Sequence, residues 1–240
     1  MLDFLLVIPT LNEEKYIGDM LLASGSILSR ECKNYKIVIM DASSDDNTME
    51  ILRNAASHDP HIVIKGGLAR GKRGRDVLHG MEMFESRAYC YIDADLSPSI
   101  AYIEEAIRKY SAGCDLAIGS RYINSKLLKR PFARKEVSLF YNHLIEFIFG
   151  DGVLDHQCGF KLFSRRFMLK VRGTRETHWA WDTEVILLAK YSGMRICEFP
   201  IKWTERRDRK TNFKKLARDI LIFMPAICRL FWRFRIVKDF

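Results

Sequence analysis

Short apolar runs alternate with amphipathic segments through the first half of the chain. The apolar runs occupy residues 4–9, 35–40, 61–65, 88–92 and 115–119. Runs of this length match buried β-strands, and their alternation with helical segments is typical of parallel sheets covered by helices on both faces. The pattern therefore predicts an α/β fold built around an open, mainly parallel sheet.

Local signals place the helices between these strands. Asn12 precedes two acids and predicts a capped helix start, and the polar residues 43–46 predict the start of a helix that reaches about residue 57. Pro98 suits the first turn of another helix. The further segments expected are helices over 76–87, 98–112, 136–149 and 182–192, a loop and strand over 155–163, and a last strand over 195–203.

Length and composition favour a single catalytic-sized domain. The chain has 240 residues, 48% of them hydrophobic, which is enough for one substantial core and too few for two full domains. Its six cysteines form no CxxC pair and its six histidines show no ligand spacing, so we expect neither a zinc site nor a disulfide framework, and a reducing compartment. The first residues lack the features of a cleaved secretion signal.

Charge is concentrated at the C-terminal end. Residues 202–240 hold twelve Lys/Arg against four Asp/Glu, which accounts for eight of the net nine positive charges. Between these charges, residues 220–228 form an uncharged stretch that is too short to span a membrane. Basic flanks around an apolar, aromatic segment favour a helix at an anionic membrane surface over a nucleic-acid partner. The alternative is a helix packed on its own domain; the predicted division is a catalytic domain over 1–210 and an amphipathic tail over 211–240.

Acidic residues lie where predicted strands end. Asp41 follows the second strand, and Asp93 and Asp95 follow the fourth. In open parallel sheets, ligands bind at this edge, and two carboxylates one residue apart suit a hard divalent cation such as Mg²⁺ or Mn²⁺. The alternative is that these acids cap the next helix.

A basic glycine-rich loop precedes the third predicted helix. Residues 66–72 read GxxxxGK, yet Arg73 stands where a nucleotide-triphosphate loop needs Ser or Thr. We therefore interpret the loop as a basic segment near a diphosphate. The dinucleotide fingerprint GxGxxG is absent, which disfavours a dehydrogenase.

Taken in order, the motifs resemble those of family 2 inverting glycosyltransferases. They are VIPTLNEE at 7–14, MDASSDDNT at 40–48, DADL at 93–96, GSR at 119–121 and DHQCGFKLF at 155–163. The resemblance covers about residues 4–210. Within the family, the chain is similar to both the dolichyl-phosphate mannose and the dolichyl-phosphate glucose synthases. It implies a GT-A fold that binds a nucleotide-sugar.

The resemblance also implies roles for individual residues. The base and ribose of the nucleotide would be held by four residues at matching positions, namely Pro9, Asn12, Glu13 and Asp41. The diphosphate and its cation would be held by Asp93 and Asp95, with basic contacts from Arg73, Arg206 and Lys210. The acceptor phosphate would face Arg121 and Arg134, and the sugar pocket would be lined by Gln157 and Lys161. Ala42 stands where the family often has a second Asp, which leaves the base open.

The implied reaction is a metal-dependent, inverting transfer of mannose or glucose from GDP-mannose or UDP-glucose to dolichyl phosphate. We expect it at the cytoplasmic face of a membrane, with the protein bound peripherally. A phosphate acceptor supplies its own anionic oxygen and needs no general base. The alternative is a same-fold enzyme that extends a saccharide or glycolipid hydroxyl, with Asp155, Asp182 or Glu184 as the base. A binding module without catalysis is disfavoured by the paired acids at 93 and 95.

Overall fold

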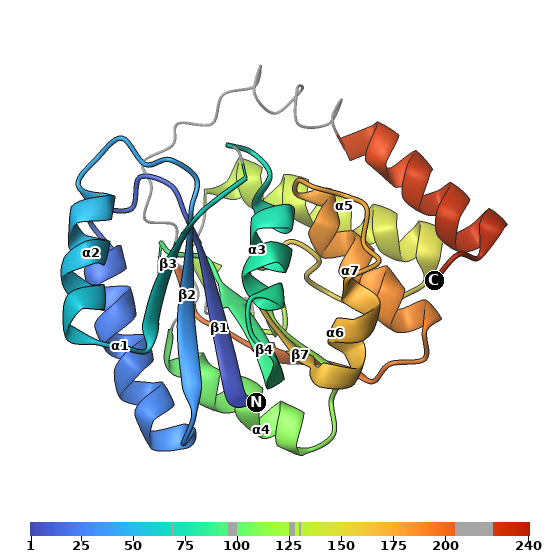
Figure 1. Cartoon of the computed structure of the whole chain (residues 1–240). Coiled ribbons are helices and arrows are strands. Elements are labelled where there is room, and N and C mark those ends of the chain that lie inside the picture. Colours follow the sequence, from blue (N-terminus) through green and yellow to red (C-terminus); the bar gives the residue numbers. More distant parts are fainter. Residues whose placement is uncertain (69, 96–99, 125–127, 130, 205–222) are drawn as a thin grey trace.

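The protein is built on one seven-stranded sheet, shown in a computed structural model (Figure 1) that describes residues 1–240 except 69, 96–99, 125–127, 130 and 205–222. In spatial order the strands are β3 (Ile62–Gly66), β2 (Tyr35–Asp41), β1 (Leu2–Thr10), β4 (Ser86–Ile92), β7 (Phe160–Ser164), β5 (Leu116–Ser120) and β8 (Ile196–Pro200). Neighbouring strands run parallel except at β7, which is antiparallel to both β4 and β5. The prediction of an open, mainly parallel sheet is confirmed.

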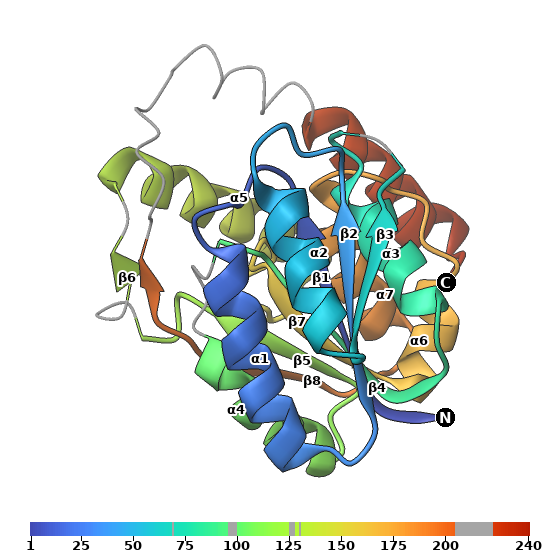
Figure 2. The same ribbon diagram turned by 60° about the vertical axis from the view of Figure 1, so that its left-hand side comes forward.

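Helices cover both faces of this sheet (Figures 1 and 2). One face carries α1 (Ile17–Glu31), α2 (Thr48–His58) and α4 (Ile103–Ser111), and the other carries α3 (Arg73–Glu82), α5 (Phe132–Phe149), α6 (Arg165–Val171) and α7 (Ala180–Tyr191). Strand β1 shows why both faces are buried. Its Leu5 and Val7 belong to one apolar core, and Phe4, Leu6 and Ile8 belong to the other, because successive side chains of a strand point to opposite faces.

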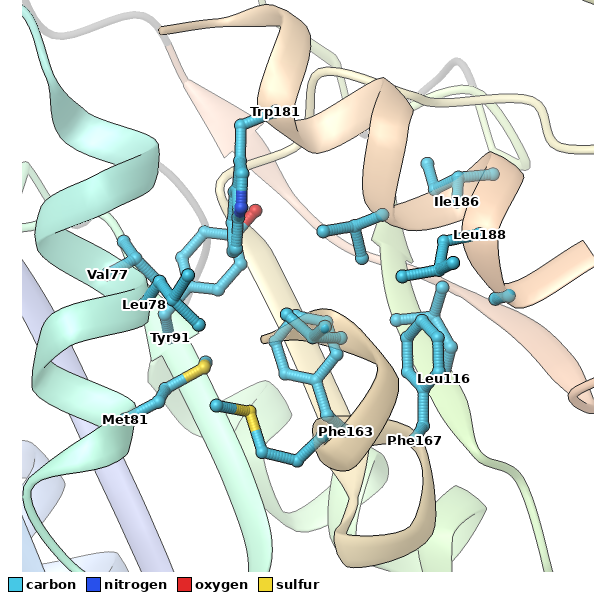
Figure 3. Packing of buried hydrophobic residues seen from close by; sticks show 14 of the residues in the cluster. Val77, Leu78, Met81, Tyr91, Leu116, Phe163, Phe167, Trp181, Ile186 and Leu188 are labelled. Carbon is cyan, nitrogen blue, oxygen red and sulfur yellow. The ribbon is translucent and has the colours of Figure 1, made fainter. Parts of the chain in front are cut away.

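The core under α3 and α7 places the start of α3 close to α7. Figure 3 shows Trp181 of α7 beside Tyr91 of β4, with Val77 of α3 nearby. The ring centres of Trp181 and Tyr91 are 5.7 Å apart. Gly74 makes this approach possible, because a Cβ there would lie 2.5 Å from the Trp181 side chain. Arg73, the first residue of α3, is thereby held next to α7.

Several predicted boundaries are wrong. Asn12 does not cap a helix: it adopts a left-handed φ of 56°, and α1 begins at Ile17. Helix α3 begins at Arg73 and ends at Glu82, since Ser86 already pairs with Leu2 in the sheet. Helix α5 begins at Phe132, directly after Pro131, instead of at residue 136. Residue 98 lies outside the described residues, and a 3₁₀ turn, Ile100–Tyr102, precedes α4.

The expectation that no disulfide forms is also wrong. Cys114, just before β5, is bonded to Cys197 in β8, with their Cα atoms 6.1 Å apart. The two cysteines are 83 residues apart in sequence, and only the adjacency of β5 and β8 brings them together. Beside the main sheet, β6 (Leu128–Lys129) pairs in parallel with β9 (Trp203–Thr204).

The C-terminal segment packs on the domain through one face. Residues 223–231 form an α-helix that continues as a π-helical turn over Trp232–Val237. The buried side chains on this segment are Ala226, Ile227, Leu230, Arg233 and Phe234, and three of them join the core under α7. Residues 211–222 of the predicted tail lie outside the described residues. In the part of the chain that the structure describes, no helix is both long enough and apolar enough to cross a membrane.

Candidate active site

The carboxyl ends of β1, β2 and β4 bring the predicted site residues to one edge of the sheet. Thr10 at the end of β1 lies opposite Asp41 at the end of β2, and β4 pairs with β1 on its other side. Asp93 follows β4 directly. The chain leaves β1 for β2 and later returns to pair β4 with β1, so the strand order reverses here, where ligands bind in open α/β sheets.

One side of this edge is organised by Ser44, which sequence analysis missed although it lies within the MDASSDDNT motif. Its hydroxyl accepts a hydrogen bond from the Asn12 amide at 2.9 Å and donates to Asp41 at 2.5 Å. Asn12 in turn accepts from the Asp45 amide at 2.8 Å. Glu13 is buried and its amide donates to the hydroxyl of Thr48, while Pro9 lies within β1. The residues expected to bind base and ribose are thus neighbours.

On the other side, Arg73 bridges two carboxylates from different elements. Its Nε and Nη2 lie 2.8 and 2.6 Å from Oδ1 of Asp93, and its Nη1 donates to Oδ2 of Asp182 at 2.8 Å. Burial alone lowers the pKa of Arg73, but Asp93 and Asp182 more than offset this and raise the pKa well above its usual value. Arg73 therefore stays protonated and positively charged at the site.

Asp182 and Lys161 form a buried pair beneath this bridge. The ammonium of Lys161 lies 2.7 Å from Asp182, 3.0 and 2.8 Å from the carbonyl oxygens of His156 and Cys158, and 3.1 Å from the Tyr91 hydroxyl, so its three N–H groups are shared among four acceptors. Lys161 is fully buried, so it supports the site from below and does not present its charge at the surface. Burial raises the pKa of Asp182, but Lys161 and Arg73 lower it by more than burial raises it. The pKa of Asp182 therefore lies below its usual value.

Asp182 and Tyr91 are site residues that sequence analysis left out of the site. Tyr91 donates its hydroxyl to Asp182, and its ring belongs to the apolar core. Asp182 was considered only as a candidate base. The helical period of α7 was the available signal, because Trp181 faces the core and the acid beside it must lie at the edge of that core.

Gln157 has an unused acceptor at the site. Its Nε2 donates to the carbonyl of Trp179 at 3.1 Å and to the Thr183 hydroxyl at 3.3 Å. Its Oε1 is buried, and among the described residues it has no hydrogen-bond partner. The ring of Trp179 is exposed, and the guanidinium of Arg73 lies 6.0 Å from its centre. A buried amide oxygen without a partner can accept one further hydrogen bond. The sugar contact expected for Gln157 stays a prediction.

Arg121 does not present a free guanidinium. Its Nε and Nη2 each donate to Asp155 at 2.7 Å, its backbone amide donates to the same carboxylate, and the ring of Trp203 lies 4.9 Å away. Burial lowers the pKa of Arg121, but Asp155 raises it above the usual value. Contact with an acceptor phosphate would require Arg121 to exchange partners. Of the other basic positions, Arg134 lies in the first turn of α5 with only its backbone described, and Arg206 and Lys210 lie outside the described residues.

Asp93 and Asp95 offer the oxygen ligands that a divalent cation prefers, and the cation site expected at them stays a prediction. Asp93 donates its amide to the Gly159 carbonyl at 2.9 Å, and a Cβ at position 159 would collide with the Asp93 carboxyl group. Glycine there leaves the space that the carboxylate occupies. Within the described ranges, no group of three or more His, Cys, Asp or Glu side chains is arranged to hold a metal. Two carboxylates with the remaining ligands from phosphate and water are typical of Mg²⁺ sites.

The three candidate bases are already engaged. Asp155 pairs with Arg121, and Asp182 pairs with Lys161 and Arg73. Glu184 is buried, accepts from the amides of residues 175 and 176, and pairs with Arg233 of the C-terminal segment. Burial raises the pKa of Glu184, but its carboxylate is enclosed by the packed C-terminal segment. None of these three acids stands unpaired at the site.

Comparisons with known proteins agree with this geometry. The model of the Glycosyl transferase family 2 matches residues 5–172. The chain is 31% identical over 231 residues to Glycosyltransferase AglD of Haloferax volcanii, covering 95% of this chain but only 36% of AglD. It is 31% identical over 230 residues to Dolichyl-phosphate beta-glucosyltransferase ALG5A of Trichomonas vaginalis, covering 90% of this chain and 71% of that protein.

Among solved structures, one similar fold is that of glucosyl-3-phosphoglycerate synthase from Mycobacterium tuberculosis in complex with Mn²⁺, UDP and glucosyl-3-phosphoglycerate. The TM-score is 0.73 at 14% identity, over 95% of this chain and 80% of that one. At this identity the likeness establishes the fold. The family match and the relatives establish the rest: the chain belongs to glycosyl transferase family 2 and is a glycosyltransferase with the GT-A fold.

Proposed function

We propose that this enzyme transfers glucose from UDP-glucose to dolichyl phosphate or a similar polyprenyl phosphate at a membrane surface. A divalent cation, Mg²⁺ or Mn²⁺, is bound at Asp93 and Asp95. The names of the relatives favour glucose over mannose, since dolichyl-phosphate beta-glucosyltransferases of Trichomonas vaginalis and Saccharomyces cerevisiae are 31% and 32% identical to the chain. The neighbouring structure with Mn²⁺ and UDP favours a cation and a uridine nucleotide.

One observation carries the choice of a phosphate acceptor: the candidate bases Asp155, Asp182 and Glu184 are each paired with a cationic side chain. Transfer to a hydroxyl needs a base whose pKa lies near the working pH. Lys161 and Arg73 instead hold the pKa of Asp182 below its usual value. A phosphate monoester is mostly dianionic at neutral pH, with its second pKa near about 6, and attacks without losing a proton to the enzyme.

The chemistry then follows from charge. An acceptor phosphate oxygen forms a bond to the anomeric carbon, the bond from that carbon to the diphosphate oxygen breaks, and its electron pair leaves with UDP, so the configuration inverts. Asp93 and Asp95 would hold the cation, which would supply Lewis-acid stabilisation of the leaving diphosphate. Gln157 accepts a hydrogen bond from a sugar hydroxyl through its unused Oε1. Asp93 itself is held in place by the backbone of Gly159.

Exposed apolar side chains support the membrane surface as the place of reaction. Phe140 and Phe147 on α5 are 69% and 88% exposed, and Trp232 and Ile236 on the C-terminal segment are 63% and 52% exposed. In Figure 1, α5 and the C-terminal helix both lie toward the upper end of the molecule, near the carboxyl ends of the strands. Aromatic and apolar side chains beside basic residues suit the headgroup region of anionic lipid. Location on the cytoplasmic side stays a prediction from the sequence.

A donor and acceptor panel tests the proposal. Radiolabelled UDP-glucose, UDP-galactose and GDP-mannose are each incubated with dolichyl phosphate or with dolichol, and lipid-linked sugar is measured by organic extraction. We expect label from UDP-glucose on dolichyl phosphate alone, abolished by EDTA and restored by Mn²⁺ or Mg²⁺. Label from GDP-mannose instead would assign the mannose donor. Transfer to a hydroxyl acceptor but not to dolichyl phosphate would overturn the proposal in favour of the glycolipid-extending alternative.

A further inference from the structure

Arg73 occupies the carboxylate that the proposed cation needs. We infer that Arg73 is an internal competitor of the divalent cation: in the empty enzyme its guanidinium neutralises Asp93, and it gives up Asp93 when the nucleoside diphosphate binds. The inference rests on the cation of the proposed function and is independent of the acceptor. It makes Arg73 a residue that couples metal binding to donor binding.

The geometry at Asp93 supports competition. Two nitrogens of Arg73 converge on the same oxygen of Asp93, at 2.8 and 2.6 Å. On its other side, the Asp93 carboxyl group lies against Gly159, where even a methyl group does not fit. The side chains of Arg73 and Asp93 are 20% and 26% exposed, so the pair is shielded from water more than a surface ion pair is. A cation that approaches this oxygen therefore meets the guanidinium.

Charge explains why displacement has to be coupled to the donor. With Arg73 in place, the Asp93 carboxylate is neutralised by the guanidinium, and without it Asp93 carries a full negative charge. Attraction for a divalent cation rises with that charge. Arg73 leaves Asp93 readily only if another anion receives it, and a diphosphate supplies that anion and also suits the bidentate geometry of a guanidinium.

The second anchor of Arg73 does not prevent this movement. Asp182 keeps the ammonium of Lys161 at 2.7 Å and the hydroxyl of Tyr91 when Arg73 turns away, so no unpaired carboxylate is left buried. Arg73 is the first residue of α3, and the amide ends of helices attract phosphate. A short swing of the side chain therefore carries the guanidinium from Asp93 toward a diphosphate at the same helix end.

The consequence is a measurable linkage between metal and nucleotide. Because coupling between two ligands is reciprocal, UDP strengthens Mn²⁺ binding by the same factor as Mn²⁺ strengthens UDP binding. Part of this factor comes from direct contact of phosphate with the metal, and part from removal of Arg73. Only the second part disappears when residue 73 carries no charge.

The test measures binding of Mn²⁺ alone, from the electron paramagnetic resonance signal of the free ion, with and without UDP. We expect Arg73→Gln to bind Mn²⁺ about fivefold or more tighter than the wild type without nucleotide, within the usual range of coupling factors. Arg73→Lys keeps the charge and stays close to the wild type. With UDP present, the Mn²⁺ affinities of the wild type and Arg73→Gln should differ less than they do without UDP.

Arg70→Gln is the matched control, because it removes an equal charge from the loop directly before α3, at a side chain that is 52% exposed and paired with Asp45. If Arg73→Gln binds Mn²⁺ no more tightly than Arg70→Gln, while the wild type binds Mn²⁺ with UDP, the inference is wrong and the proposed cation stands. If neither the wild type nor any variant binds Mn²⁺ even with UDP, the cation itself is wrong and the inference falls with it. Thermal unfolding of each variant confirms that the fold is retained.

Discussion

At the scale of single residues, Asp182 joins the two halves of the site. It receives Lys161 from β7, Arg73 from α3 and the hydroxyl of Tyr91 from β4, and it is 1% exposed. The two cations and the carboxylates of Asp182 and Asp93 balance in charge. Such a buried network is stable when every member is paired and costly when one partner is removed.

Asp182→Asn is therefore expected to destabilise the protein by about 3–5 kcal/mol, because it leaves the buried ammonium of Lys161 without a negative partner. Urea unfolding followed by fluorescence measures the loss. The control is Asp45→Asn, whose carboxylate is 69% exposed and pairs with Arg70 at the surface; it is expected to cost under about 1 kcal/mol. Equal effects of the two substitutions would contradict the buried network.

The same residue sets an expectation for acid stability. Because Lys161 and Arg73 lower the pKa of Asp182 in the folded state, its stabilising contribution is complete above the unfolded pKa of about 3.9 and is lost as pH falls toward the folded value. Unfolding free energy measured from pH 6 to pH 3 should fall more steeply below about pH 4 in the wild type than in Asp182→Asn. Parallel curves would show that Asp182 does not titrate with folding.

Gly159 is a second residue whose role is visible only in three dimensions. Gly159→Ala adds a methyl group that collides with the Asp93 carboxyl group, so the carboxylate must move. We expect Mn²⁺ affinity in the presence of UDP to fall by about tenfold or more, as is usual when support for a metal ligand is lost. Gly66→Ala is the control, because a Cβ at position 66 meets no atom within 4 Å. Unchanged Mn²⁺ binding in Gly159→Ala would remove Asp93 from the metal site.

At the scale of elements, the C-terminal segment has two apolar faces with different partners. The inner face buries Leu230 and Phe234 against the core, and Arg233 reaches Glu184 of α7. The outer face exposes Trp232 and Ile236. The alternative of a packed helix and the expectation of a membrane-surface helix thus concern opposite faces of one element. Deleting the segment would open the core, so single faces must be altered instead.

Charged substitutions on the outer face separate the two roles. Trp232→Glu with Ile236→Glu should weaken binding to anionic lipid vesicles by roughly tenfold or more, since each apolar side chain contributes about 1.5–3 kcal/mol when buried. The melting temperature should stay close to that of the wild type. Vesicle co-sedimentation at two salt concentrations measures the affinity.

Two further substitutions act as controls for the faces of the segment. Leu22→Glu, on α1 and 77% exposed, places one negative charge, half the number added by the outer-face variant, on a helix of the opposite face of the sheet and should leave vesicle binding unchanged. Phe234→Ala, on the buried face, should instead lower the unfolding free energy by about 3–5 kcal/mol. If the outer-face variant binds vesicles like the wild type, lipid does not contact this face.

At the scale of the whole molecule, one covalent bond joins distant parts of the chain. The disulfide of Cys114 and Cys197 closes a loop of more than eighty residues that contains α5, β7 and α7. In the oxidised protein, Cys114→Ser or reduction is expected to cost about 2–4 kcal/mol of unfolding free energy, because the unfolded chain regains entropy. Urea midpoints with and without dithiothreitol measure this. If dithiothreitol reduces the Cys114–Cys197 bond but leaves the urea midpoint of the wild type unchanged, the disulfide does not stabilise the fold.

Local patterns in the sequence determined much of this protein. The period of the apolar runs predicted the strands and the parallel sheet, because a residue's place in a strand or helix depends on its near neighbours. Asp41 and Asp93 were placed at one edge of the sheet for a related reason: all parallel strands point the same way, so residues that follow them must gather.

Only the tertiary structure decided which charge neutralises which. Arg73 and Asp182 are 109 residues apart, Arg121 and Asp155 are 34 apart, and no local pattern pairs them. The insertion of antiparallel β7 between β4 and β5 brings Lys161 under the site, which strand periodicity does not predict. Secondary structure follows from short-range sterics and hydrophobic period, whereas ion pairs and burial depend on contacts that exist only after the chain has folded.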